Sequence, residues 1–291
     1  MLICDGNSTY HDEILNSLKE HGFRNTMFLL DVYEIHNPFN QPVALSTEGI
    51  AYFQKNSNLI FQALELLADD ASREIFVRCL MTHIHRRPVP LPERPRHEQY
   101  FPTDVPLARG HERFVCCGAY DGDTIRLLNR QKGKIKALAC FEPEPKIFQR
   151  LSEYLWKNQG TIANELSSWP CALYRHSGQL PFISGHGLGS RIDPSGEATV
   201  QCVTLDDALP GFAPTFICMD VEGAEPAVLE GGRKILETHQ PDLGVCVYHA
   251  PNHLWEIPLY LDQLNLGYRF YLRNYTSFTI ETVLYAVAPE A

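Results

Sequence analysis

The chain has 291 residues, of which 44% are apolar and 21% charged, which excludes a protein that is disordered, collagen-like or coiled-coil throughout. Its net charge of −10, from 25 Lys and Arg against 35 Asp and Glu, disfavours non-specific binding of nucleic acid. No apolar run reaches the roughly 18 residues of a membrane span, and the first residues lack the features of a secretory signal. The nine cysteines are scattered without a C-x-x-C pair, so we expect reduced thiols in a cytoplasmic protein.

Residues 1–85 are predicted to form a small accessory N-terminal α/β region. A short strand at 2–4 precedes a helix that starts near the capping-box residues Thr9 and Asp12 and ends at Gly22, and a second strand follows at 27–32. Two apolar stripes between 58 and 85 have helical spacing. Nothing in this region indicates chemistry.

Residues 86–106 contain closely spaced prolines, at positions 88, 90, 92 and 95. Proline removes backbone donors and favours extended structure, so this segment is predicted to be a semi-rigid connector. Its arginines could contact an acidic partner, although a solvated linker is the simpler interpretation.

Residues 107–291 alternate between apolar strands and amphipathic helices, a pattern typical of an α/β fold with a mostly parallel sheet. The last two strands, 268–272 and 282–287, are joined by a short turn and must pair antiparallel. The other predicted strands are 114–117, 135–141, 171–173, 200–203, 216–219 and 243–247, and the predicted helices begin near 123 and span 145–156, 226–236 and 253–264.

The first of these strands ends in a turn that contains Gly118 and Gly122. Two glycines at a strand-to-helix turn let the backbone approach a ligand, and the following helix points free N–H groups at it. The next strand ends at Glu142, about 20 residues after Gly122, where an acidic side chain can accept both hydroxyls of a ribose. Together the two features predict a nucleoside site.

The strand at 216–219 delivers Asp220 and Glu222 to the same carboxyl edge of the sheet. Glu225 in the same segment is interpreted as a helix-start residue, favoured by the helix dipole.

Several motifs in this order resemble the FkbM family of S-adenosylmethionine-dependent methyltransferases: FVCCGAYDGDT, FEPEPKIFQRL, VTLDD, FICMDVEGAEPAVLEGG, VYHAPNHLWEIP and FYLRNY…ETVLYAV. The resemblance covers about residues 113–288. It implies a class I methyltransferase Rossmann-like sheet with strand order 3-2-1-4-5-7-6. It also implies O-methylation of a hydroxyl on a sugar, a glycan or a natural-product scaffold, so the expected partner is a small-molecule or saccharide acceptor. The acidic net charge already disfavours a nucleic acid.

The resemblance also implies roles for individual residues of this chain. The turn from Gly118 to Gly122 would enclose the methionine part of the cofactor, Glu142 would hold its ribose, the backbone near Cys171 and Ala172 would flank its adenine, and Asp220 and Glu222 would face the transfer site. The expected cofactor-binding residues are Cys116, Gly118, Ala119, Tyr120, Asp121, Gly122, Thr124, Glu142, Pro143, Cys171 and Ala172.

An alkyl hydroxyl is a poor nucleophile, so a general base should assist the transfer. His249 follows the fifth strand at the active edge and has a suitable ordinary pKa, whereas Glu222 is the competing candidate and a structural role for His249 is equally favoured. A metal site at His249 and His253 is disfavoured because Pro251 interrupts any helix between them. His186 lies in a Gly-rich segment, 184–190, that we interpret as a loop over the substrate.

Two alternatives to an active methyltransferase remain open. An NAD-dependent oxidoreductase is disfavoured because Tyr120 and Ile125 occupy positions where the dinucleotide fingerprint requires glycine. A non-catalytic cofactor-binding module is suggested by Cys116 and Cys218, which stand where the family commonly has an Asp and a Lys. The first and fourth strands are neighbours in the expected sheet, so these two positions should lie close together.

Overall fold

The structure is a computed structural model that describes residues 2–3, 17–22, 27–28, 49–85, 89–185, 189–276 and 279–290. The predicted capping box at Thr9 and Asp12, the connector residues 86–88 and His186 lie outside the described residues. The chain divides into two compact units. The first comprises Met1–Gln99, Val247–Glu256 and Leu272–Val283, and the second comprises Tyr100–Cys246, Ile257–Tyr271 and Leu284–Ala291.

The first unit contains a parallel pair of short strands, β1 (Leu2–Ile3) and β2 (Met27–Phe28), and the helices α3 (Ile50–Lys55), α4 (Ser57–Leu66) and α5 (Asp70–His85). Helices α4 and α5 follow the two predicted apolar stripes, and α3 is an additional helix. The Asp69 carboxylate accepts the Ser72 N–H at 2.8 Å, which caps the first turn of α5, and forms an ion pair with Arg273 at 2.7 Å. A short 3-10 helix, η2 (Arg96–Glu98), ends this part of the chain.

The main sheet has seven strands, in the order β12-β13-β11-β10-β3-β4-β5. The five from β11 to β5 pair in parallel. Strands β12 and β13 are joined by residues 275–281 alone, a connection that permits only antiparallel pairing. This is the predicted class I order. The strands are β3 (Arg113–Cys117), β4 (Ile135–Phe141), β5 (Ala163–Trp169), β10 (Phe216–Met219), β11 (Asp242–Cys246), β12 (Arg269–Asn274) and β13 (Thr282–Val287).

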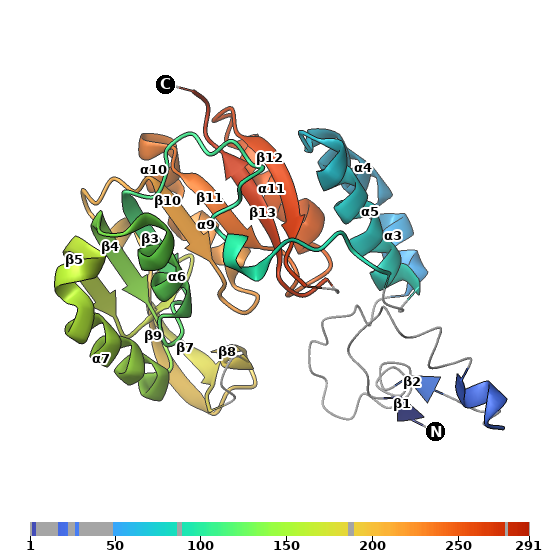
Figure 1. Cartoon of the computed structure of the whole chain (residues 1–291), viewed down its shortest axis with the longest axis horizontal. Coiled ribbons are helices and arrows are strands. Elements are labelled where there is room, and N and C mark those ends of the chain that lie inside the picture. The colour runs from blue at the N-terminus through green and yellow to red at the C-terminus, as the bar shows by residue number, and fades with distance from the viewer. Residues whose placement is uncertain are drawn as a thin grey trace. The chain divides into compact units, whose positions relative to one another are not determined.

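Helices alternate with these strands as the sequence predicts (Figure 1). Two differ from expectation: α7 runs six residues past the predicted end at Trp156, and the helix expected over 226–236 is divided at Gly232 into α9 and α10. The helices are α6 (Asp123–Lys132), α7 (Pro145–Ile162), α8 (Leu205–Ala208), α9 (Glu225–Gly231), α10 (Arg233–His239) and α11 (His253–Gln263).

In chain order, the third strand of the main sheet is β5. The segments 171–173 and 200–203, which the sequence led us to place in that sheet, are not part of it, so that assignment was wrong. They form β6 (Ala172–Leu173) and part of β9 (Ala198–Val203), which join β7 (Gly178–Ile183) and β8 (Arg191–Ile192) in a separate four-stranded sheet of order β6-β9-β7-β8 (Figure 1). Strand β5 is an edge strand whose residues are mostly accessible to solvent, so it lacks the apolar run by which a buried parallel strand is found.

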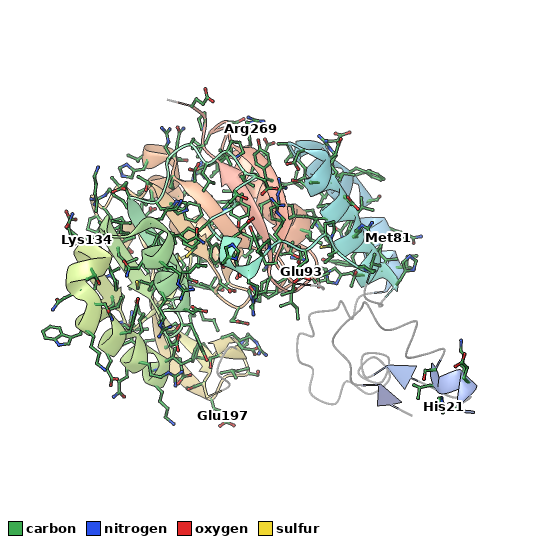
Figure 2. All side chains as sticks on the ribbon, in the orientation of Figure 1. His21, Met81, Glu93, Lys134, Glu197 and Arg269 are labelled. Carbon is green, nitrogen blue, oxygen red and sulfur yellow. The ribbon has the colours of Figure 1, made fainter. Side chains whose placement is uncertain are left out.

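Among the described helices, none is both long enough and apolar enough to cross a bilayer. Figure 2 shows the side chains, with Lys134 labelled beside the start of β4 and Glu197 beside the four-stranded sheet.

Candidate active site

A pocket lies within the second unit, where the carboxyl ends of β3, β4 and β10 meet the four-stranded sheet. It encloses about 680 Å³ of empty space, including solvent at its mouth. The structure brings together at this pocket most of the predicted site residues: Gly118, Tyr120, Glu142, Pro143, Cys171, Ala172, Asp220 and Glu222.

Gly118 begins the turn after β3 with a φ of +80°, a conformation that favours glycine. A Cβ atom at this position would lie 1.8 Å from the backbone oxygen of Asp220. The N–H groups of Gly118 and Ala119 both donate to the Phe141 carbonyl, at 3.1 and 2.9 Å. The absence of a side chain therefore lets the ends of β3, β4 and β10 approach closely enough to form one side of the pocket.

Tyr120 and Glu222 line the pocket and both have positive φ angles, of 45° and 53°. Non-glycine residues rarely adopt this conformation, and such strain concentrates at functional sites. The Tyr120 N–H donates to Glu142 Oε2 at 2.9 Å, so the turn after β3 is tied to the side chain that ends β4.

Glu142 is 6% exposed, and both of its carboxylate oxygens accept backbone N–H groups. Oε2 accepts from Tyr120 and Oε1 accepts from Glu144, each at 2.9 Å. Burial raises the pKa of Glu142 to about 7; the nearby Glu144 carboxylate adds to the rise, while the two hydrogen bonds and Arg150 oppose it. The carboxyl group is thus held firmly and changes its charge near neutral pH.

Asp220 and Glu222 follow β10 and are half-buried in the pocket lining. The Asp220 N–H donates to the Cys117 carbonyl at 2.9 Å, which extends the pairing of β10 with β3 to the pocket. Glu225 begins α9 as expected, and its Oε1 accepts the Val221 N–H at 2.9 Å, so this buried side chain also fixes the turn that carries Glu222.

Other predicted cofactor residues lie beside the pocket and are not in its lining. Ala119 is fully buried, and Asp121 forms an ion pair with Arg126 at 2.8 Å. Gly122 precedes α6 in the left-handed conformation, and Thr124 lies in the first turn of that helix. These residues shape the turn and the start of α6, and direct cofactor contact by their side chains stays a prediction.

His249 belongs to the first unit, where it is half-buried and its ring centroid lies 4.2 Å from that of Tyr248. Its assignment as a general base remains a prediction.

Sequence reasoning missed the pocket residues that come from the four-stranded sheet, Phe182 of β7 and Arg191 and Ile192 of β8. The sequence carried a signal for β7, because the apolar Leu180 and Phe182 alternate with Gln179 and Pro181, as in a half-buried strand. Phe182 of β7 packs with Ala172 of β6 and with Val200 and Cys202 of β9, so these residues form the hydrophobic core of the four-stranded sheet.

A row of three thiols crosses the neighbouring strands β10, β3 and β4. Cys116 is in register with Cys218 on one side and with Cys140 on the other. The Sγ atoms of Cys116 and Cys218 lie 3.3 Å apart, and both side chains are buried. Burial raises the pKa values of Cys218 and Cys140 well above the ordinary range, so their thiols are neutral at physiological pH. The expected proximity of positions 116 and 218 is confirmed, although neither residue is in the pocket lining.

The family model that describes the methyltransferase FkbM domain matches residues 117–270, more than half of the chain. The chain belongs to the FkbM methyltransferase family. The resemblance found in the sequence is thereby confirmed. A search of curated proteins gives no match.

Among solved structures, an FkbM methyltransferase from Methylobacillus flagellatus KT is similar, with 25% sequence identity and a TM-score of 0.79 over 97% of this chain and 71% of that one. More distant similarity links this FkbM-family chain to Aeropyrum pernix fibrillarin, with 11% identity and a TM-score of 0.38 over 75% of this chain and 76% of that one. The O-methyltransferase TomG from Streptomyces achromogenes has 13% identity and a TM-score of 0.38 over 81% and 97% of the two chains.

Proposed function

We propose that the chain is an S-adenosylmethionine-dependent O-methyltransferase that acts on a hydroxyl of a sugar, a glycan or a natural-product scaffold. The family supports methyl transfer. The observation that supports the cofactor assignment is the state of Glu142. Its buried carboxylate is held by two backbone N–H groups in the lining of a strand-end pocket.

The residues present fit this cofactor. A carboxylate at the end of the second strand suits a ribose, and carboxylate oxygens that already accept one N–H each retain lone pairs for hydroxyl groups. Cys171, Ala172 and Phe182 give the pocket an apolar part that suits an adenine ring. Gly118 presents no side chain to the position proposed for the methionine part, and its turn packs directly against the Asp220 backbone.

The cofactor supplies a methyl group activated by a sulfonium. The task of the protein is then to align the acceptor oxygen and to remove its proton. Glu222 is the base candidate within the pocket, and Asp220 beside it would orient the acceptor hydroxyl or stabilise the sulfonium charge. His249 remains the alternative base.

Isothermal titration of the purified protein with S-adenosylhomocysteine, and separately with NAD, tests the cofactor assignment. We expect binding of the former and none of the latter, and the reverse would reject the proposal. Methyl transfer from labelled S-adenosylmethionine to a panel of saccharides and hydroxylated small molecules then tests the acceptor class.

The contact between Cys116 and Cys218 favours a second candidate, a cofactor-binding module without catalytic activity. The family commonly places an Asp and a Lys at these positions, and their loss removes charges close to the cofactor site. Tight binding of S-adenosylhomocysteine, without transfer to any acceptor in a broad panel, would favour this candidate.

A further inference from the structure

One oxygen of Glu144 collects three hydrogen bonds from the connection between β7 and β8. Its Oε2 accepts the Ser184 hydroxyl at 2.9 Å, the Gly185 N–H at 3.0 Å and the Ser190 hydroxyl at 3.2 Å. Strand β7 ends at Ile183 and β8 begins at Arg191, so these donors lie at both ends of the connection. The residues that follow β7 and precede β8 are therefore hydrogen-bonded to the same buried carboxylate.

Glu144 is also linked to the proposed ribose acceptor, because its own N–H donates to Glu142 Oε1 at 2.9 Å. Ser190 and the next two residues line the pocket together with Phe182 of β7. A single residue thus connects the carboxylate on one side of the pocket with the wall formed by the four-stranded sheet.

A simpler role for Glu144 would be to cap α7, since it occupies the N-cap position of that helix. Its side chain, however, makes no capping hydrogen bond to the helix. Its Oε2 accepts instead from the β7–β8 connection, 40 to 46 residues further along the chain. Glu144 is 5% exposed, and hydrogen bonds to a charged acceptor are stronger than those between neutral groups.

We propose that Glu144 is a positioning residue that anchors both ends of the β7–β8 connection and so holds Ser190, Arg191 and Ile192 against the nucleoside part of the bound cofactor. This inference rests on the proposed function. It adds that the affinity for the nucleoside depends on a side chain that does not itself line the pocket.

The test uses the full chain and two ligands, S-adenosylhomocysteine and 5′-methylthioadenosine, which lacks the amino acid part. Glu144→Ala removes the acceptor, and we expect it to weaken binding of both ligands by a similar factor, roughly 10–100-fold, the equivalent of one or two hydrogen bonds to a charged group. Glu144→Gln keeps one oxygen that can accept the same donors, so it should restore most of the affinity. The backbone amide of Gly185, which donates to Glu144, should exchange hydrogen faster in the Ala variant only.

Asp207→Ala is the matched control. Its Oδ2, on the exposed Asp207 side chain, accepts the Ser177 hydroxyl at 2.8 Å just before β7, so the variant removes a carboxylate–hydroxyl bond from the same sheet away from the pocket. We expect no change in affinity. If Glu144→Ala destabilises the whole protein, the double variant Ser184→Ala with Ser190→Ala removes two donors and should weaken binding in the same way.

The proposal is overturned if Glu144→Ala binds both ligands as tightly as the parent, or if Asp207→Ala weakens binding equally. It is also overturned if only S-adenosylhomocysteine loses affinity, because the effect would then act on the amino acid part. Failure of the parent protein to bind either ligand would instead reject the proposed function.

Discussion

The Sγ atoms of Cys116 and Cys218 lie 3.3 Å apart on neighbouring strands, at positions that are partners in the register of β3 and β10. The family commonly has an acidic residue at the first position and a basic residue at the second. A charged pair here would be buried in the sheet next to the pocket, and two neutral thiols replace it without leaving an unpaired charge.

Because an Asp and a Lys at these positions would lie close to the proposed cofactor site, we expect that restoring both charges strengthens cofactor binding. We expect Cys116→Asp combined with Cys218→Lys to bind S-adenosylhomocysteine more tightly than the parent, measured by titration calorimetry, with an unchanged unfolding midpoint. Either single variant should destabilise the protein by roughly 3–5 kcal/mol in urea unfolding, because it buries one uncompensated charge. A double variant that unfolds, or that binds more weakly than the parent, contradicts this account.

Removing the Glu142 carboxylate should weaken cofactor binding directly. Glu142→Ala leaves the ribose hydroxyls without a charged acceptor, at a cost of roughly 1.5–3 kcal/mol in the free energy of binding. The control is Glu153→Ala, which removes an exposed carboxylate on α7 whose partner is Gln149. Equal affinity of Glu142→Ala and the parent for S-adenosylhomocysteine would show that the ribose site lies elsewhere.

The raised pKa of Glu142, about 7, predicts two opposite effects of pH. The ionised form accepts ribose hydroxyls, so affinity for S-adenosylhomocysteine should fall as the pH drops below about 7. The stability of the unliganded protein should change in the other direction. Because the pKa of Glu142 in the folded protein exceeds the ordinary value of 4.5, protonated Glu142 contributes to the free energy of unfolding. This contribution is complete below about pH 4.5 and is lost as the pH rises through about 7.

Glu142→Gln carries no titrating group and should remove both dependences. Calorimetric titrations and thermal unfolding of the parent and this variant between pH 5 and pH 8 would measure them. Parallel pH profiles of the two proteins would rule out Glu142 as the group responsible.

The close packing of Gly118 against the Asp220 backbone predicts that Ala will be tolerated less well at Gly118 than at another glycine of positive φ. Gly118 and Gly211 both have positive φ, of 80° and 74°, so Ala at either site strains the backbone. A Cβ at Gly211 has no heavy atom of the described chain within 4 Å, whereas one at Gly118 overlaps the Asp220 carbonyl. We expect Gly118→Ala to lower the free energy of unfolding more and to abolish cofactor binding. Urea unfolding and calorimetry measure both, and similar losses in the two variants would contradict the argument.

The base assignment predicts a loss of turnover without a loss of cofactor affinity. Replacing the true base, by Glu222→Gln or His249→Gln, should lower the rate with an authentic acceptor by about 10²–10⁴-fold. His239→Gln, at the end of α10, serves as the control for the loss of a histidine. Full activity of both Glu222→Gln and His249→Gln would remove the base hypothesis.

The sequence alone determined the fold class and the strand ends at which the pocket forms. Buried parallel strands such as β3, β4 and β10 are mostly apolar, and each is followed at once by the turn that carries Gly118, Glu142 or Asp220. These signals are local, because the strand, the turn and the side chain that it presents are adjacent along the chain.

Only the tertiary structure decided the edge strand β5, the separate four-stranded sheet and the hydrogen bonds of Glu144. A polar edge strand carries a weak hydrophobic pattern, and local periodicity does not specify which strands pair. The contacts of Glu144 with Ser184 and Ser190 depend on the packing of segments some 40 residues apart. The contact of Cys116 with Cys218 was foreseen from the expected strand order, but its 3.3 Å separation follows from the register of two strands that only the folded sheet brings together.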